Sequence, residues 1–226
     1  MNNKVIIAIH MPKTGGSSLK NQISSLFNND EVYFDYDGDP ANPNSNIQLN
    51  PFHYERQNIE PNGYKFIYGH FPSCKYRNVK DAFRMTFLRE PIDNIISIYN
   101  FWMLHQIEKW ENALFQYVVK NKLTIVEFSR LPTFRNLYSK VYFQEQDIES
   151  FDFVGDFKFY DAELDRLSGL LGVKFDKSVR DNVTGNLKSE SGHELIVKDE
   201  LTVEDIRLIN DALIDDKSFY ERYVGK

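Results

Sequence analysis

The chain has 226 residues, a formal net charge of −6, 42% hydrophobic residues and 15% aromatic residues. This length fits one large domain with a sizeable core, and the acidic balance argues against charge-driven binding to nucleic acid or anionic membranes. A single cysteine, Cys74, excludes an intrachain disulfide framework and a multi-cysteine zinc site. Because we find no signal peptide and no apolar stretch of about 18 residues, we expect a cytoplasmic chain with no transmembrane segment.

The first predicted strand, Val5–Ile9, runs directly into a turn that contains two glycines, one lysine and three hydroxyls. This turn reads HMPKTGGSS over residues 10–18, and a predicted helix, Ser17–Phe27, follows it. Glycines let backbone N–H groups approach an anion, and the positive end of a helix dipole adds to the attraction. The pattern therefore indicates a phosphate-binding loop. An ordinary connection with a solvated lysine is the alternative, and His10 either faces the ligand or has a buried structural role.

The lysine of this turn stands in an unusual place. In the triphosphate-binding pattern G-x-x-x-x-G-K-[ST] the lysine follows the last glycine, whereas Lys13 precedes Gly15 and Gly16. Lys13 can still supply a point charge to a phosphoryl or sulfuryl oxygen. We therefore expect an anionic nucleotide as the ligand, with neither ATP nor GTP as the first candidate.

Strands and helices alternate along the rest of the chain. A short strand is possible at Val32–Phe34, and the Asn-, Asp- and Pro-rich residues 35–63 are expected to form a long loop, either a substrate-side flap or a surface excursion. Further strands are predicted at Tyr64–Tyr68, Ala82–Leu88 and Phe151–Gly155, and helices from Pro91 to about Lys109, over most of 111–150, at Ala162–Leu171 and at Thr202–Tyr223. This alternation predicts an α/β fold of three layers, with a mainly parallel central sheet flanked by helices, in a single domain over residues 1–226.

A second candidate anion site lies where the strand Ala82–Leu88 ends. Arg89 follows that strand, at the edge where ligands bind in open parallel sheets, and Ser97 lies about two turns into the next helix. Arginine offers a bidentate fork to a phosphate, and the serine hydroxyl adds one more donor. A structural salt bridge from Arg89 to Glu90 or Asp93 is the alternative. Together, the two sites imply a ligand with two separated phosphate groups.

Both motifs resemble the nucleotide site of the sulfotransferase family, especially its branch that acts on carbohydrate hydroxyls. Residues 10–19 are similar to the loop that binds the 5′-phosphosulfate, and residues 87–91 with Ser97 are similar to the 3′-phosphate site. The resemblance implies a P-loop-like sulfotransferase fold and the donor 3′-phosphoadenosine 5′-phosphosulfate (PAPS), with adenosine 3′,5′-bisphosphate (PAP) as product and no metal. It also implies a small-molecule or glycan acceptor with a free hydroxyl, a carbohydrate first.

The resemblance further implies a role for each motif residue. Lys13 would neutralise the bridging oxygen as the sulfur–oxygen bond breaks, and Arg89 with Ser97 would hold the 3′-phosphate. Lys188, in a late glycine turn, is expected near a phosphate, with Asn186 as the alternative. The 5′-phosphosulfate would be held by the backbone N–H groups and hydroxyls of Thr14, Gly15, Gly16, Ser17 and Ser18.

His70 is the residue that we expect to act as the base for the acceptor hydroxyl. It follows a predicted strand at the edge where the loops converge, and an imidazole titrates near neutrality. It also matches a Gly-His of the carbohydrate 2-O-sulfotransferases, which carry a second histidine two residues earlier, where this chain has Tyr68. The alternative is a structural histidine, in which case the base is a glutamate such as Glu55, Glu60 or Glu108.

Two rival functions remain open for the same sequence. A nucleotide or small-molecule kinase predicts dependence on ATP and magnesium, against which the position of Lys13 and the pair of Arg89 and Ser97 argue. A non-catalytic nucleotide-binding module predicts binding without transfer to any acceptor. The sequence does not identify the acceptor.

Overall fold

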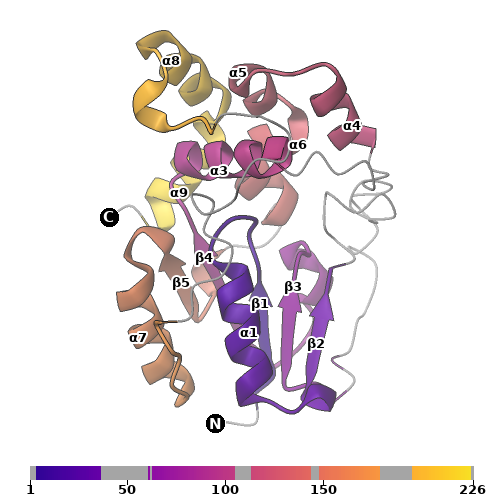
Figure 1. The fold of residues 1–226 in the computed structure, drawn as a ribbon. Coiled ribbons are helices and arrows are strands. Elements are labelled where there is room, and N and C mark those ends of the chain that lie inside the picture. The colour runs from indigo at the N-terminus through magenta and orange to yellow at the C-terminus, as the bar shows by residue number, and fades with distance from the viewer. Residues whose placement is uncertain are drawn as a thin grey trace.

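The computed structural model describes residues 4–36, 61, 63–104, 113–143, 148–178 and 195–224. In this part of the chain five parallel strands form one sheet in the order β2-β3-β1-β4-β5 (Figure 1). The strands are β1 (Ile6–Ile9), β2 (Val32–Asp35), β3 (Phe66–Gly69), β4 (Phe83–Leu88) and β5 (Phe153–Asp156). The predicted α/β fold, with a parallel central sheet flanked by helices, is confirmed.

Side chains that alternate along the strands give the sheet two apolar faces. One face, which includes Ala8 and Tyr68, packs against helices α1 (Gly16–Leu26) and α7 (Tyr160–Leu171). The other face, which includes Ile9, packs against helices that follow β4, among them α3 (Pro91–Leu104). The sheet is therefore buried on both sides, as parallel sheets require.

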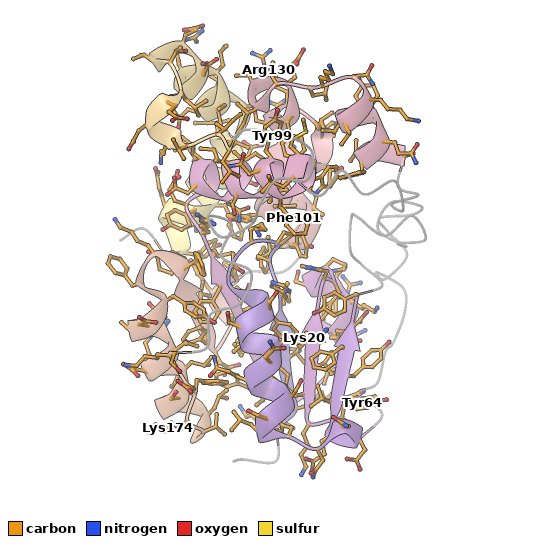
Figure 2. The ribbon with its side chains drawn as sticks, in the orientation of Figure 1. Lys20, Tyr64, Tyr99, Phe101, Arg130 and Lys174 are labelled. Atoms are coloured by element: carbon orange, nitrogen blue, oxygen red, sulfur yellow. The ribbon has the colours of Figure 1, made fainter. Side chains whose placement is uncertain are left out.

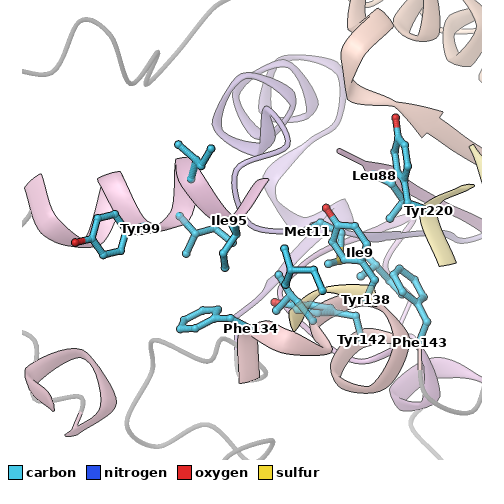
Figure 3. Close-up of a cluster of buried hydrophobic side chains, with 14 of the residues drawn as sticks. Ile9, Met11, Leu88, Ile95, Tyr99, Phe134, Tyr138, Tyr142, Phe143 and Tyr220 are labelled. Carbon is cyan, nitrogen blue, oxygen red and sulfur yellow. The ribbon is translucent and has the colours of Figure 1, made fainter. Parts of the chain in front are cut away.

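The helices beyond β4 share a core that is rich in aromatic side chains. The ring centroid of Trp102 lies 5.4 Å from that of Phe115 and 5.1 Å from that of Phe134. Tyr138 and Tyr142 belong to the same buried cluster, together with Met11 from the β1–α1 loop (Figure 3). These helices are α4 (Ala113–Lys120), α5 (Ile125–Ser129), α6 (Pro132–Arg135), the π-helix η3 (Leu137–Tyr142), α8 (Val203–Ala212) and α9 (Ile214–Tyr223).

The prediction of one terminal helix over Thr202–Tyr223 is wrong, because the helix is interrupted at Leu213. Thr202 caps α8 through a capping box, as its sequence indicates: its Oγ1 accepts the N–H of Asp205 at 3.0 Å. Leu213 is 1% exposed, and the break at this residue lets the chain turn so that α9 also buries Tyr220 in the core. A single straight helix would place its apolar residues along one straight stripe, and the shape of the core does not match such a stripe.

Other predicted elements are present with shifted ends. The possible strand at Val32–Phe34 is β2, at the edge of the sheet, and residues 111–150 contain several short helices rather than long ones. Residues 37–60 and the predicted end of the helix near Lys109 lie outside the described residues. In the ranges that are described, no helix has the length and apolar character needed to cross a bilayer. Short 3-10 turns lie at Asn29–Glu31, Ser73–Tyr76, Ile148–Ser150, Phe157–Phe159 and Lys198–Glu200.

Candidate functional site

The β1–α1 loop leads directly into the N-terminus of a helix. Lys13 and Gly15 have φ values of 63° and 77°, in the left-handed region, and these two residues turn the chain sharply into α1. The hydroxyl of Thr14 is used inside the loop, where it donates to the carbonyl of Met11 at 2.8 Å. Gly15 is the N-cap of α1, and as a glycine it has no side chain with which to cap this end of the helix. The first N–H groups of an α-helix have no partner within the helix, so this end can bind an anion.

Gly16 allows the loop to close over the partly buried ring of His10. A Cβ atom built on Gly16 would overlap the ring of His10, so that no larger residue fits here without displacing that ring. The Nδ1 atom of His10 is inaccessible and has no hydrogen-bond partner among the described residues. Burial, together with the nearby charges of His70 and Lys13, lowers the pKa of His10 well below its usual value. His10 is therefore a neutral ring beneath the loop.

The two sequence motifs meet at Lys13 and Arg89. These residues are 76 positions apart, and Nη1 of Arg89 donates a hydrogen bond of 3.2 Å to the carbonyl of Lys13. The Lys13 amine lies 4.6 Å from the ring centroid of Phe101, which projects from α3 towards the loop (Figure 2). Burial, and the positive charge of Arg89, lower the pKa of Lys13 to about 8. The loop lysine and the strand-end arginine thus form one cationic centre.

Among the described residues Arg89 has no ion pair within 4 Å; burial lowers its pKa, although the charges of Asp93 and Glu90 act on it in the opposite direction. Glu90 and Asp93 instead pair with Lys198, at 3.3 and 2.9 Å. The Arg89 guanidinium packs on the Phe157 ring at 5.3 Å. Ser97 lies on α3 and is 7% exposed, and the hydrogen bond of the Arg89 guanidinium is to Lys13 rather than to Ser97.

His70 follows β3 and lies beside the loop. Its Nδ1 is 2.6 Å from the carbonyl oxygen of His10. Because a carbonyl oxygen can only accept, Nδ1 carries a proton, so Nε2 is the unprotonated nitrogen whenever the ring is neutral. The His10 ring stacks on the His70 ring with centroids 4.4 Å apart. The Tyr36 ring packs edge-on against the His70 ring, with centroids 5.2 Å apart. This tautomer is the one that a base acting through Nε2 requires.

Tyr68 stands at the position that carries the second histidine in the 2-O-sulfotransferases. Its hydroxyl donates to the carbonyl of Gly16 at 2.9 Å, which ties β3 to the start of α1. Its ring also stacks on His10, with centroids 5.2 Å apart. The imidazole that neighbours His70 therefore comes from His10, directly after the adjacent strand β1, rather than from position 68.

Three further residues hold the site, and sequence reasoning missed them. Asn94 donates from Nδ2 to the carbonyl of Pro12 at 2.8 Å, and Tyr138 donates from its hydroxyl to the carbonyl of Arg89 at 2.8 Å. The hydroxyl of Tyr142 lies 3.5 Å from Nδ1 of His70. Both tyrosines belong to the π-helix η3, a geometry that is frequent at functional sites but has no signal in this sequence.

Several predicted site residues lie outside the described part of the chain. They are Lys188 with its alternative Asn186, and the alternative bases Glu55, Glu60 and Glu108. The structure therefore brings together the loop, Arg89 and His70, with Ser97 on the neighbouring helix, and does not bear on these five residues.

Comparison with known proteins identifies the family. The model of the sulfotransferase family matches residues 2–149, a range that contains both motifs and His70. The chain is also similar to the solved structure of mouse sulfotransferase SULT7A1 complexed with PAP, with 13% identity, a TM-score of 0.45 and coverage of 99% of this chain and 90% of that one. For a sulfotransferase from Alicyclobacillus acidocaldarius the identity is 15%, the TM-score 0.46 and the coverage 100% and 97%. No curated protein matches. Because the family model covers well over half of its residues, this chain belongs to the sulfotransferase family.

Proposed function

We propose that this sulfotransferase moves a sulfuryl group from PAPS to an acceptor hydroxyl, with a carbohydrate hydroxyl as the first candidate. The observation that carries the proposal is the hydrogen bond of 3.2 Å from Arg89 to the carbonyl of Lys13. It joins two anion-binding motifs into one site, and PAPS has an anionic group at each end of its ribose. A ligand with a single phosphate cluster would leave one of the two motifs unused.

In this proposal the donor is bound by charge and by directed N–H groups. The N-terminus of α1 receives the 5′-phosphosulfate, with Thr14 contributing its backbone N–H because its hydroxyl donates to Met11. Arg89 and Ser97 receive the 3′-phosphate, and a bidentate guanidinium suits that group. ATP has no 3′-phosphate, so this second contact selects PAPS over ATP.

The reaction needs alignment and charge stabilisation more than covalent help. The acceptor oxygen attacks the sulfur, its proton passes to Nε2 of His70, and the bond from sulfur to the bridging phosphate oxygen breaks. The electron pair leaves with PAP, where the Lys13 ammonium stabilises the bridging oxygen. Lys13 must first leave the ring of Phe101, over which its amine lies. A positively charged Lys13 and a neutral His70 are therefore required together.

A thermal-shift titration tests the donor assignment. We expect PAP to raise the melting temperature, because a ligand at 100 times its Kd stabilises a protein by about 2.7 kcal/mol. ATP with magnesium should have no comparable effect. Stabilisation by ATP with magnesium and not by PAP would instead identify a kinase and overturn the proposal.

A transfer assay separates the enzyme from a binding module. PAPS labelled in its sulfate is incubated with a panel of monosaccharides, glycans and phenols, and labelled products are counted. We expect transfer to at least one carbohydrate. We expect Lys13→Ala to abolish it, while PAP still binds but more weakly, because the charge of Lys13 is lost. Binding of PAP with no transfer to any acceptor of the panel would favour the non-catalytic module.

A further inference from the structure

We propose that His10 is a positioning residue, which sets the spacing between the phosphate-binding loop and the base His70. The proposal rests on the function proposed above, because it concerns how base and donor loop are held for one transfer. It adds a role for a residue that is expected to touch neither the donor nor the acceptor.

His10 is fixed beside His70 by the sheet itself. Ile9 pairs with Gly69 in the parallel ladder, and the N–H of His10 donates to the carbonyl of Gly69 at 2.8 Å. In return, Nδ1 of His70 donates to the carbonyl of His10 at 2.6 Å. The two rings are then stacked at 4.4 Å with an angle of 20° between their planes. The main chain of His10 sets the tautomer of His70, and its ring restricts the rotation of the His70 ring.

The same ring also contacts the loop. It lies where a Cβ of Gly16 would be, so it packs directly against the backbone at the first residue of α1. Tyr68 reinforces this contact, because its ring stacks on His10 and its hydroxyl donates to the carbonyl of Gly16 at 2.9 Å. A flat and rigid group thus fills the space between His70 and the N-terminus of α1.

His10 is not itself placed to take a proton. Its Nδ1 is inaccessible, and its Nε2 is the ring atom nearest to the position of a Gly16 Cβ. Its environment holds three positive or titratable groups, His70, Lys13 and Lys20, all of which oppose a charge on its ring. A ring that stays neutral repels neither the loop lysine nor a protonated His70 formed during transfer.

Loss of the His10 ring, the spacer between His70 and the loop, should affect turnover more than donor binding. In-line transfer depends on the relative placement of base and donor, and a displacement of about 1 Å can cost roughly 100-fold in rate. The N–H groups that hold the donor belong to α1 and need no contact with His70. His10→Ala should therefore lower kcat and leave the affinity for PAP nearly unchanged.

The experiment compares three variants of the full chain. His10→Ala removes the ring and His10→Phe keeps a flat ring of similar size, while both variants keep the main-chain carbonyl that accepts from His70. Phe27→Ala is the control, because it removes a buried ring from the same packing between α1 and the sheet, at the far end of the helix. Circular dichroism and PAP titration establish that each variant is folded and binds nucleotide.

Two readouts are measured. The first is kcat with an acceptor found in the transfer assay: we expect a fall of roughly 100-fold in His10→Ala, with substantial rescue in His10→Phe and a change below about threefold in Phe27→Ala. The second is the tautomer of His70, from nitrogen-15 NMR of the histidine rings. We expect the Nδ1–H form in the wild type and in His10→Phe. In His10→Ala we expect a mixture of tautomers, because without the stacked ring the His70 ring can rotate away from the carbonyl that holds the proton on Nδ1.

The two readouts keep this inference separate from the proposed function. If His10→Ala retains wild-type kcat, or retains the single His70 tautomer, His10 is not a positioning residue. If PAP affinity falls as much as kcat, His10 acts on the donor site and the inference is equally wrong. If the wild type transfers sulfate to no acceptor, the proposed function fails, and the NMR comparison alone then decides whether His10 orders His70.

Discussion

At the scale of single residues, Lys13 combines two demands that conflict. In the proposed reaction it must carry a charge to meet an anionic donor, yet burial and the neighbouring Arg89 lower its pKa to about 8. In the structure its amine lies over the Phe101 ring, a contact that favours a cation. The arrangement keeps a partly desolvated amine at the site, and a bound polyanionic ligand would favour its protonated form.

This conflict predicts how donor binding depends on pH. The free protein loses the Lys13 proton as pH rises through about 8, so PAP binding above that pH requires proton uptake and should weaken. The phosphates of PAP are fully ionised above about pH 7, so they add no further pH dependence to its affinity in that range. Calorimetric titrations with PAP from about pH 7 to about pH 9.5 measure the slope, which we expect to approach tenfold per pH unit.

Lys13→Arg is the control for this prediction, because a guanidinium stays charged over the whole range. Its PAP affinity should be nearly independent of pH between about 7 and about 9.5. An equal slope in the wild type and in Lys13→Arg would show that another group titrates.

At the scale of elements, the π-helix η3 connects the C-terminal helices to the site. Asp216 on α9 accepts hydrogen bonds from the N–H groups of Tyr138 and Ser139, each at 2.9 Å, and from the Ser139 hydroxyl at 2.6 Å. Tyr138 in turn donates to the carbonyl of Arg89, and Tyr142 lies beside His70. One buried carboxylate thus orders the turn from which both tyrosines reach the site.

Asp216 also makes a stability prediction with a definite sign. Burial raises its pKa from 3.8 to about 6, so the folded chain binds this proton more tightly than the unfolded chain does. The contribution of Asp216 to stability is therefore greatest below about pH 4 and falls as pH rises to about 6. Relative to the wild type, Asp216→Asn should gain up to about 3 kcal/mol of unfolding free energy across this window.

Urea denaturation of both proteins between about pH 4 and about pH 7 measures this difference. Ser139→Ala is the matched control, because it removes one hydrogen bond to Asp216 and leaves the carboxylate in place. Because that hydrogen bond lowers the pKa of Asp216, its loss should destabilise the protein more at the high pH than at the low pH, opposite in sign to Asp216→Asn. A difference between Asp216→Asn and the wild type that stays constant with pH would contradict the assignment.

At the scale of the whole molecule, the order of the strands creates the site. β1 and β4 are parallel neighbours, so the loop after β1 and Arg89 after β4 emerge at the same edge of the sheet. β3 lies on the other side of β1 and delivers His70 to that edge. The sheet topology thus brings together three segments that are far apart in the sequence.

This arrangement predicts that a single ligand protects distant segments together. PAP should slow amide hydrogen exchange at residues 14–19 and at residues 89–97 with the same dependence on concentration, since both bind one molecule. Arg89→Ala should weaken the protection of both segments, by about 1.5–3 kcal/mol for a lost charged hydrogen bond. Protection of the loop alone would mean that Arg89 and Ser97 do not belong to the donor site.

Much of the site could be predicted because it depends on local patterns. The apolar run of β1, the glycines after Lys13, and an arginine at a strand end are each visible within a few residues of sequence. Asn94, Tyr138 and Asp216 could not be predicted, since each acts through a hydrogen bond to a partner far away in the chain, as in the bond from Asn94 to Pro12. The break at Leu213 also depends on the shape of the core and not on local preference.

By itself, then, the sequence determined the α/β fold, the candidate phosphate-binding loop and the likeness to sulfotransferases, because strand periodicity, glycine turns and helix starts depend on near neighbours. Only the tertiary structure decided which groups meet at the loop. It placed the partly buried ring of His10 between His70 and Gly16, and Arg89 on the carbonyl of Lys13. The physical reason is that parallel strand order and side-chain packing join residues from different segments, and no local pattern of residues records those contacts.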